Sequence, residues 1–280
     1  MLAGYTYAHA IDTATSNLAG VPPNSLNYSA ERGNGDYDIR HRFTLSATYD
    51  LPSKKHSFLE MLEGWQVTGI LTLEGGEPFT LGDFGNDTSS TGELNDRWIM
   101  TGSPSNVHWS ARNPLPYVDL LQFNTDPNTG DVTSGITPTA QLCVTQAFAN
   151  GGQAAANQLV GGPNGITGGC FVSSNTIITP PAQGTQGTMG RNIFRGPSFR
   201  NLDASISKVW NLHERVKLQL RGEFFNLTKR ANFDVFTMNT DLSAPSTVGT
   251  VVYTPDVAAA NPVIGSGGSR HIQIGTKVLW

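Results

Sequence analysis

The chain has 280 residues, a formal net charge of −4 and 14% charged residues, together with 31 glycines and 16 prolines. The charged fraction lies well below the roughly 25% of a typical soluble domain, and the negative charge excludes the basic surface with which proteins bind nucleic acid. No window approaches the ~20 apolar residues of a membrane-spanning helix. The composition favours β-strands joined by long polar loops and argues against a helical enzyme.

Six stretches alternate apolar and polar residues with the period of two that is typical of a β-strand. The clearest is "RVKLQLRGEFFNL", in which Val216, Leu218 and Leu220 face one way while Lys217 and Gln219 face the other. In chain order, the predicted strands lie near residues 2–10, 42–51, 64–75, 200–210, 215–226 and 270–280.

The connections between these strands are long, short, very long, short and long, and the third is a long loop insertion at residues 78–199. Successive connections of an antiparallel meander fall at opposite ends of the sheet, so all the long connections gather at one end. Transmembrane β-barrels have this asymmetry, with short periplasmic turns, longer extracellular loops and strands of about 9–11 residues. The sequence therefore predicts an all-β, antiparallel up-and-down meander of about six long strands, and places residues 1–280 in a transmembrane β-barrel.

A secreted, soluble β-sandwich that binds sugars or surfaces is the alternative, because its strands also alternate apolar and polar residues. Strands of a sandwich are usually nearer 5–6 residues long, and a loop above about 15 residues is unusual in a compact domain. The two architectures differ in where the apolar face points. A barrel turns it outward to lipid, whereas a sandwich buries it between two sheets.

Four aromatic residues, Tyr49, Trp65, Trp210 and Trp280, lie at the short-turn ends of the predicted strands. An aromatic girdle at the membrane–water interface accounts for these positions, because such rings are apolar while their N–H or O–H groups need polar partners. Aromatic residues that fill the end of a sandwich are the alternative.

Charged residues on the polar faces of the predicted strands would point into the lumen of a barrel. They form either a track for a ligand or plug, or a hydrated wall braced by salt bridges, and the wall is favoured. The residues are Asp203, Arg215, Lys217, Arg221, Glu223, His271 and Lys277.

A cationic segment, "RNIFRGPSFR", leads into the fourth predicted strand and contains Arg191, Arg195 and Arg200. These arginines could bind an anionic ligand or lipopolysaccharide. Salt bridges between loops are the favoured interpretation.

Two cysteines, Cys143 and Cys170, lack the Cys/His spacing of a zinc site. A disulfide between them is favoured if the chain is exported, and two unpaired thiols are the alternative. The stretch "NTDPNTGD" at 124–131 superficially resembles a calcium loop, but its glycine comes one place late and a plain turn is expected. No enzymatic motif occurs, so the chain is expected not to be an enzyme and to use no metal or cofactor.

The stretch "GTMGRNIFRGPSFRNLDASISKVWNLHERVKLQLRGEFFNLTKRANF", with the terminal "RHIQIGTKVLW", resembles the C-terminal barrel region of TonB-dependent outer-membrane receptors. It looks most like the Oar-like group, whose members carry an N-terminal carboxypeptidase-regulatory-like domain. The earlier "DIRHRFTLSATYDLP" and "GWQVTGILTLEGGEPFT" resemble preceding strands of the same region.

This resemblance implies a bacterial outer-membrane protein that imports an unknown ligand with energy relayed by TonB. Barrels of this family have about 22 strands and an N-terminal plug, so six strands are expected to be the C-terminal portion of a larger barrel. TonB would act only through a plug domain that this sequence does not contain. The expected partners are outer-membrane lipid, the imported ligand and the barrel-assembly machinery, which would read a C-terminal signal made of Ile272, Ile274, Thr276, Val278 and Trp280.

Overall fold

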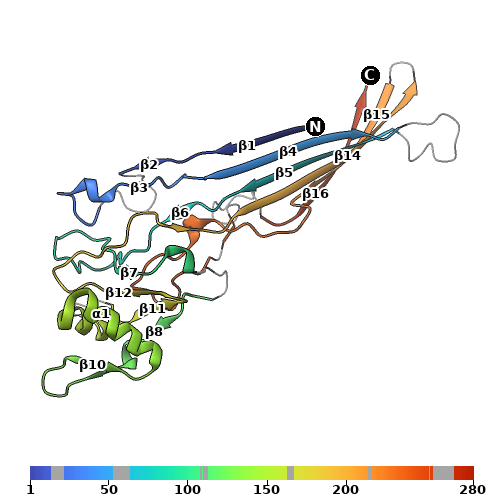
Figure 1. Cartoon of the computed structure of the whole chain (residues 1–280). Coiled ribbons are helices and arrows are strands. Elements are labelled where there is room, and N and C mark those ends of the chain that lie inside the picture. The colour runs from blue at the N-terminus through green and yellow to red at the C-terminus, as the bar shows by residue number, and fades with distance from the viewer. Residues whose placement is uncertain are drawn as a thin grey trace.

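The structure is a computed structural model that describes residues 1–13, 22–52, 64–107, 109, 113–162, 167–213, 216–251, 253–254 and 268–280. A long curved sheet fans away from a folded body (Figure 1). The body lies at the sheet end that carries the long connections, while the C-terminus lies at the opposite end.

One antiparallel sheet of six strands has neighbours in the order β1-β4-β5-β14-β15-β16 (Figure 1). This is the up-and-down meander predicted from the alternation, and it is a single sheet rather than the two packed sheets of a sandwich. The sheet is not closed, because among the described residues β1 pairs only with β4 and β16 only with β15. The strands are β1 (Leu2–Tyr7), β4 (His41–Asp50), β5 (Trp65–Glu74), β14 (Phe199–His213), β15 (Val216–Phe225) and β16 (His271–Leu279).

Residues 78–199 are a folded body and not the long loop that the sequence predicts. Its main sheet has the strand order β7-β12-β11-β8, and a two-stranded pair β6-β13 joins it to the six-stranded sheet. The strands of the body are β6 (Pro78–Phe79), β7 (Ile99–Thr101), β8 (Tyr117–Val118), β9 (Phe123–Thr125), β10 (Val132–Gly135), β11 (Cys170–Ser173), β12 (Thr176–Thr179) and β13 (Phe194–Arg195).

A helix, α1 (Pro138–Asn157), crosses the body, so the prediction of an all-β chain is wrong for this insertion. Thr137 caps the helix by accepting a hydrogen bond from the backbone N–H of Ala140 at 3.1 Å, and Pro138 fits the first turn. The helix is kinked at Gly151 and Gly152. No helix in the described part of the chain is long and apolar enough to cross a membrane.

The remaining elements are short. A two-stranded pair, β2 (Ile11–Asp12) with β3 (Gly33–Asn34), lies in the β1–β4 connection. The 3₁₀ turns are η1 (Tyr28–Glu31), η3 (Pro104–Asn106), η4 (Leu120–Gln122), η5 (Gln158–Val160) and η7 (Val235–Thr237).

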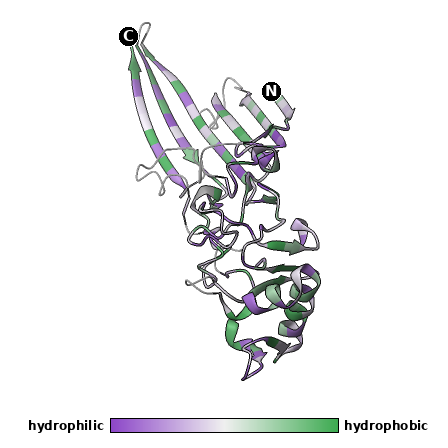
Figure 2. Cartoon of the chain, turned by 90° about the vertical axis from the view of Figure 1, so that its left-hand side faces the viewer, coloured by the Kyte–Doolittle hydropathy of each residue, from purple (hydrophilic) through white to green (hydrophobic). Residues whose placement is uncertain are grey.

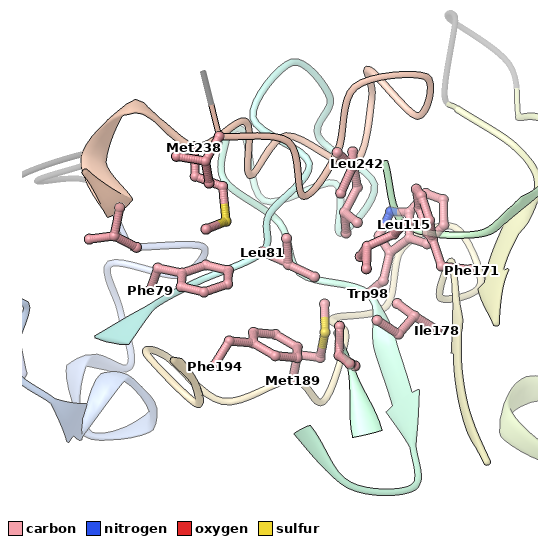
Figure 3. Packing of buried hydrophobic residues seen from close by; sticks show 14 residues of the cluster. Phe79, Leu81, Trp98, Leu115, Phe171, Ile178, Met189, Phe194, Met238 and Leu242 are labelled. Carbon is pink, nitrogen blue, oxygen red and sulfur yellow. The ribbon is translucent and has the colours of Figure 1, made fainter. Parts of the chain in front are cut away.

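The buried hydrophobic residues belong to the body and to the β15–β16 connection, while the six-stranded sheet buries almost none. Figure 3 shows the larger cluster, in which Trp98 and Leu81 are fully buried at the centre. Leu242, from the β15–β16 connection, packs into the same cluster. A second cluster lies between α1 and the strands beside it. The body and the β15–β16 connection therefore share a core that lies apart from the faces of the six-stranded sheet.

Candidate functional site

The strand register keeps one face of the six-stranded sheet apolar from edge to edge. Leu45 lies opposite Leu71, and Leu71 lies opposite Leu202. Farther along, Gly222 lies opposite Ile274. Figure 2 shows the resulting bands of hydrophobic and hydrophilic residues along the strands. Because a one-residue shift would move every side chain to the opposite face, this register is the one that the alternation requires.

Much of this apolar face is exposed. Within β16, Ile272 is 58% exposed and Ile274 is 75% exposed, and Trp280 beyond the strand is 93% exposed. A contiguous apolar surface of this kind on a polar chain marks contact with a partner or a membrane. The residues of the predicted C-terminal signal lie along it: Ile272, Ile274, Thr276 and Val278 in β16, followed by Trp280.

The opposite face is polar and carries the charges predicted for a lumen. Arg221 and Glu223 form an ion pair at 2.7 Å, and Arg42 pairs with Glu74 at 3.0 Å. Asp203 accepts a hydrogen bond from the backbone N–H of Asn226 at 2.8 Å. Lys217, His271 and Lys277 share this face through the register of β15 with β16, and Arg215 lies outside the described residues. The charged groups of this face therefore interact mainly with other groups of the same face, as expected of a polar wall with internal salt bridges.

Aromatic residues gather at the short-turn end of the apolar face. The rings of Trp65 and Trp210 meet edge to face with centroids 6.2 Å apart. The ammonium group of Lys208 lies 5.8 Å from the centroid of Trp65 and 5.2 Å from that of Trp210. The indoles cover a cation that would otherwise interrupt the apolar surface, an arrangement that cation–π attraction favours. Tyr49 is exposed at the same end of β4.

Two arginines of the segment that leads into β14 bind the body to the β1–β4 connection. Arg191 pairs with Asp12 and donates to the backbone carbonyl of Glu31 at 2.8 Å. Arg195 pairs with the buried carboxylate of Asp38. These are the inter-loop salt bridges favoured from the sequence. Arg200 forms none within the described chain and lies apart from them.

Hydrogen bonds reinforce this junction. Asn192 is buried and donates to Asp36 at 2.7 Å and to the carbonyl of Asn34 at 2.8 Å, while its own side-chain oxygen accepts from Thr80. The pKa of Asp38 is shifted upward by burial, but hydrogen bonds from Arg195, from the backbone N–H of Ala10 and from Arg40 outweigh that effect and lower it overall. Sequence reasoning missed these partners, because no local pattern marks the asparagines and aspartates of a loop as buried.

Next to this junction is a cavity of about 510 Å³, within the size range of small-molecule sites. Trp109 forms one wall of the cavity. Its ring packs edge to face against the rings of Phe79 and Phe194, with centroid distances of 4.5 Å and 5.6 Å. Arg195, whose guanidinium is paired with Asp38, also lines the cavity. The lining residues are Pro104, Ser105, Val107, Trp109, Ile193, Arg195, Gly196 and Pro197.

A disulfide joins Cys143 in α1 to Cys170 in β11, and both residues are fully buried in the second hydrophobic cluster. The stretch at 124–131 forms the turn between β9 and β10, and Asp126 accepts hydrogen bonds from the backbone N–H groups of Asn128 and Thr129. The carboxylate therefore stabilises its own turn. Among the described residues, no three His, Cys, Asp or Glu side chains are placed to hold a metal ion.

Two carboxylates, one in the body and one directly before it, are held in surroundings that favour their protonated forms. Burial raises the pKa of Asp83 to about 6, against the lowering effect of hydrogen bonds from Asn86 and Trp98. Burial and the neighbouring charge of Asp234 raise the pKa of Glu77 to about 7. Each group binds its proton more tightly in the folded state than in the unfolded chain.

From the raised pKa values of Asp83 and Glu77 we expect the free energy of unfolding to be larger at pH 5 than at pH 7.5. The contribution of a group with a raised folded-state pKa is complete below the unfolded pKa and is lost as the pH rises through the folded pKa. Asp83 alone contributes on the order of 1 kcal/mol over this range. Urea denaturation of the detergent-solubilised protein at several pH values should show the midpoint falling toward pH 7.5. In Asp83→Asn this slope should flatten, and an unchanged slope would contradict the assignment.

Comparison with known proteins agrees with this geometry. A family described as "Outer membrane beta barrel domain" matches residues 1–273. No curated protein and no solved structure matches the chain. A match over nearly the whole chain, together with an exposed apolar face, a polar opposite face and antiparallel strands of about ten residues, shows that the chain belongs to the outer membrane beta barrel domain family of the bacterial outer membrane.

Proposed function

We propose that the chain supplies barrel wall and ligand-recognising extracellular surface to a TonB-dependent receptor of the Oar-like group, which imports its ligand across the outer membrane. The observation that carries the proposal is the folded body at the long-connection end of the sheet. A barrel wall alone does not require a folded insertion with a hydrophobic core and a disulfide, so this body is expected to have a function of its own, such as ligand recognition.

The junction between body and sheet supports this role. Arg191 and Arg195 are held by carboxylates from the β1–β4 connection. One partner of each pair is partly exposed, so breaking a pair should cost less than the about 3–5 kcal/mol of a fully buried one. The body is thus tied to the β1–β4 connection. Binding residues are commonly carried by loops on a rigid scaffold, and the cavity beside Trp109 lies at this junction.

The cavity suggests the chemistry of the ligand. Most of its lining is apolar, with an indole and prolines, and the charge of Arg195 is already balanced by Asp38. A small molecule that is largely apolar or planar would suit these surroundings. The polar wall below, braced by the Arg221–Glu223 and Arg42–Glu74 pairs, would line the path of import.

Capture by the periplasmic domain of TonB tests the proposal. An affinity tag inserted at Gly130, in the exposed turn between β9 and β10, would allow the protein to be isolated from outer membranes without disturbing the sheet. We expect the isolated receptor, with the plug that the proposal requires, to bind purified TonB periplasmic domain. A porin from the same membrane serves as the control. Failure to bind above the porin level would refute TonB coupling while leaving the barrel assignment intact.

A further inference from the structure

Four exposed cations lie at the long-connection end of the six-stranded sheet: Arg200, Lys229, Arg230 and Arg270. In this they differ from Arg191, Arg195, Arg97 and Arg42, which all pair with carboxylates. Among the described residues, none of the four forms an ion pair with a carboxylate. Within the described part of the chain, whose full sequence has a net negative charge, these four cations therefore have no carboxylate partner.

Two buried asparagines hydrogen-bond to the backbone of the segments that carry these cations. Asn226 donates to the backbone carbonyls of Arg230 and Gly268, at 2.6 Å each, and accepts from the backbone N–H of Arg230 at 3.0 Å. Asn232 binds both backbone groups of Arg200, at 2.8 and 3.0 Å. The start of β14, the turn after β15 and the approach to β16 are thus tied into one backbone network, although residues 200 and 270 are far apart in the chain.

The network lies beside the lipid-facing side of the sheet. Arg200 is paired across the strands with Leu73, whose side chain belongs to the apolar face. Arg270 directly precedes β16, where Ile272 is 58% exposed on that face. Longer connections of outer-membrane barrels are extracellular. The four cations therefore lie where the apolar surface meets the outer leaflet headgroups.

We propose that Arg200, Lys229, Arg230 and Arg270 form a docking site for the phosphates of an anionic glycolipid of the lipid A type in the outer leaflet. Guanidinium groups bind phosphate through paired N–H donors, and clustered basic residues next to a membrane attract anionic headgroups. The acyl chains would lie along the apolar face below Arg200 and Arg270. A phosphorylated lipid would contact both the cations and the apolar surface. A soluble anion would contact only the cations.

The test compares two triple variants of equal charge change in the protein purified from outer membranes. Arg200→Gln, Arg230→Gln and Arg270→Gln remove cations of the proposed site. Lys217→Gln, Arg221→Gln and Lys277→Gln remove the same charge from the opposite face. Binding of lipid A in detergent micelles is measured for both, with phosphatidylglycerol as the competing anionic lipid. At about fivefold per cation, the first variant should bind lipid A about 100-fold more weakly, and the second should stay within about twofold of the wild type.

Equal loss in the two variants, or equal affinity of the wild type for phosphatidylglycerol and lipid A, would overturn the proposal in favour of diffuse attraction. Among the described residues, the side chains replaced in the first variant make no ion pair, and in the second variant only Arg221 does, with Glu223. Protease resistance of the body would verify that both variants keep the fold. Arg270→Gln alone provides a milder variant with an expected fivefold loss. Retention of wild-type affinity in that variant and in the triple variant would also reject the site.

Discussion

Ile206→Arg is expected to prevent accumulation of the folded protein in the outer membrane, whereas the neighbouring Ser205→Arg is expected to be tolerated. Ile206 lies in the middle of β14 on the apolar face, opposite Val67 and Gly222. An arginine on the lipid face of a barrel strand costs about 2–4 kcal/mol near the bilayer midplane. Ser205 lies on the polar face opposite Glu223, which already pairs with Arg221, and an added cation on this face stays in contact with water.

The two variants differ by one position and introduce the same residue, so expression and charge are matched. The amount of folded protein is measured in the outer-membrane fraction through its resistance to denaturation by detergent in the cold. Similar losses for both variants would contradict the assignment of faces. A greater loss for Ser205→Arg would reverse it.

The second large effect is expected at the disulfide. Replacing Cys143 and Cys170 together by alanine removes a cross-link between residues 27 positions apart. Loop-closure entropy for a loop of this size corresponds to about 3.5 kcal/mol. The loss should unfold the part of the body around α1, because the second hydrophobic cluster is small and both cysteines lie inside it.

Limited proteolysis of the detergent-solubilised protein should then show early cleavage between residues 120 and 180 while the six-stranded sheet stays protected. Wild-type protein with its disulfide reduced is the matched control, since its sequence is unchanged. If the double variant resisted protease as well as the oxidised wild type does, the disulfide would not be what stabilises this part of the body.

Sequence reasoning identified the six strands because alternation is local. The alternation within each strand identifies its apolar and polar faces, and the strand register then aligns the apolar faces into one surface. The same reasoning missed α1, although its signals are in the sequence: Thr137 and Pro138 at the start, followed by Ala140, Cys143, Val144 and Ala147 at helical spacing. Those signals lie inside a region rich in Gly, Asn and Thr, whose composition is typical of loops.

Local sequence patterns could not predict which polar residues are buried. Asn192, Asn226 and Asn232 look like ordinary loop residues, yet each is buried and binds backbone groups from other segments. The arginine segment before β14 was recognised as a place for salt bridges, but its carboxylate partners could not be named. Only folding brings Asp12 and Asp38 beside it.

The sequence by itself determined the strand faces, the meander and the gathering of long connections at one end, because period-two alternation and chain order require no distant contacts. The tertiary structure alone decided that residues 78–199 form a folded body whose core includes the β15–β16 connection, and that this body is tied to the β1–β4 connection. Those features depend on contacts between residues as far apart as Arg195 and Asp38, 157 positions from each other. No local pattern contains such a pairing, since it exists only after hydrophobic burial has closed the long loops.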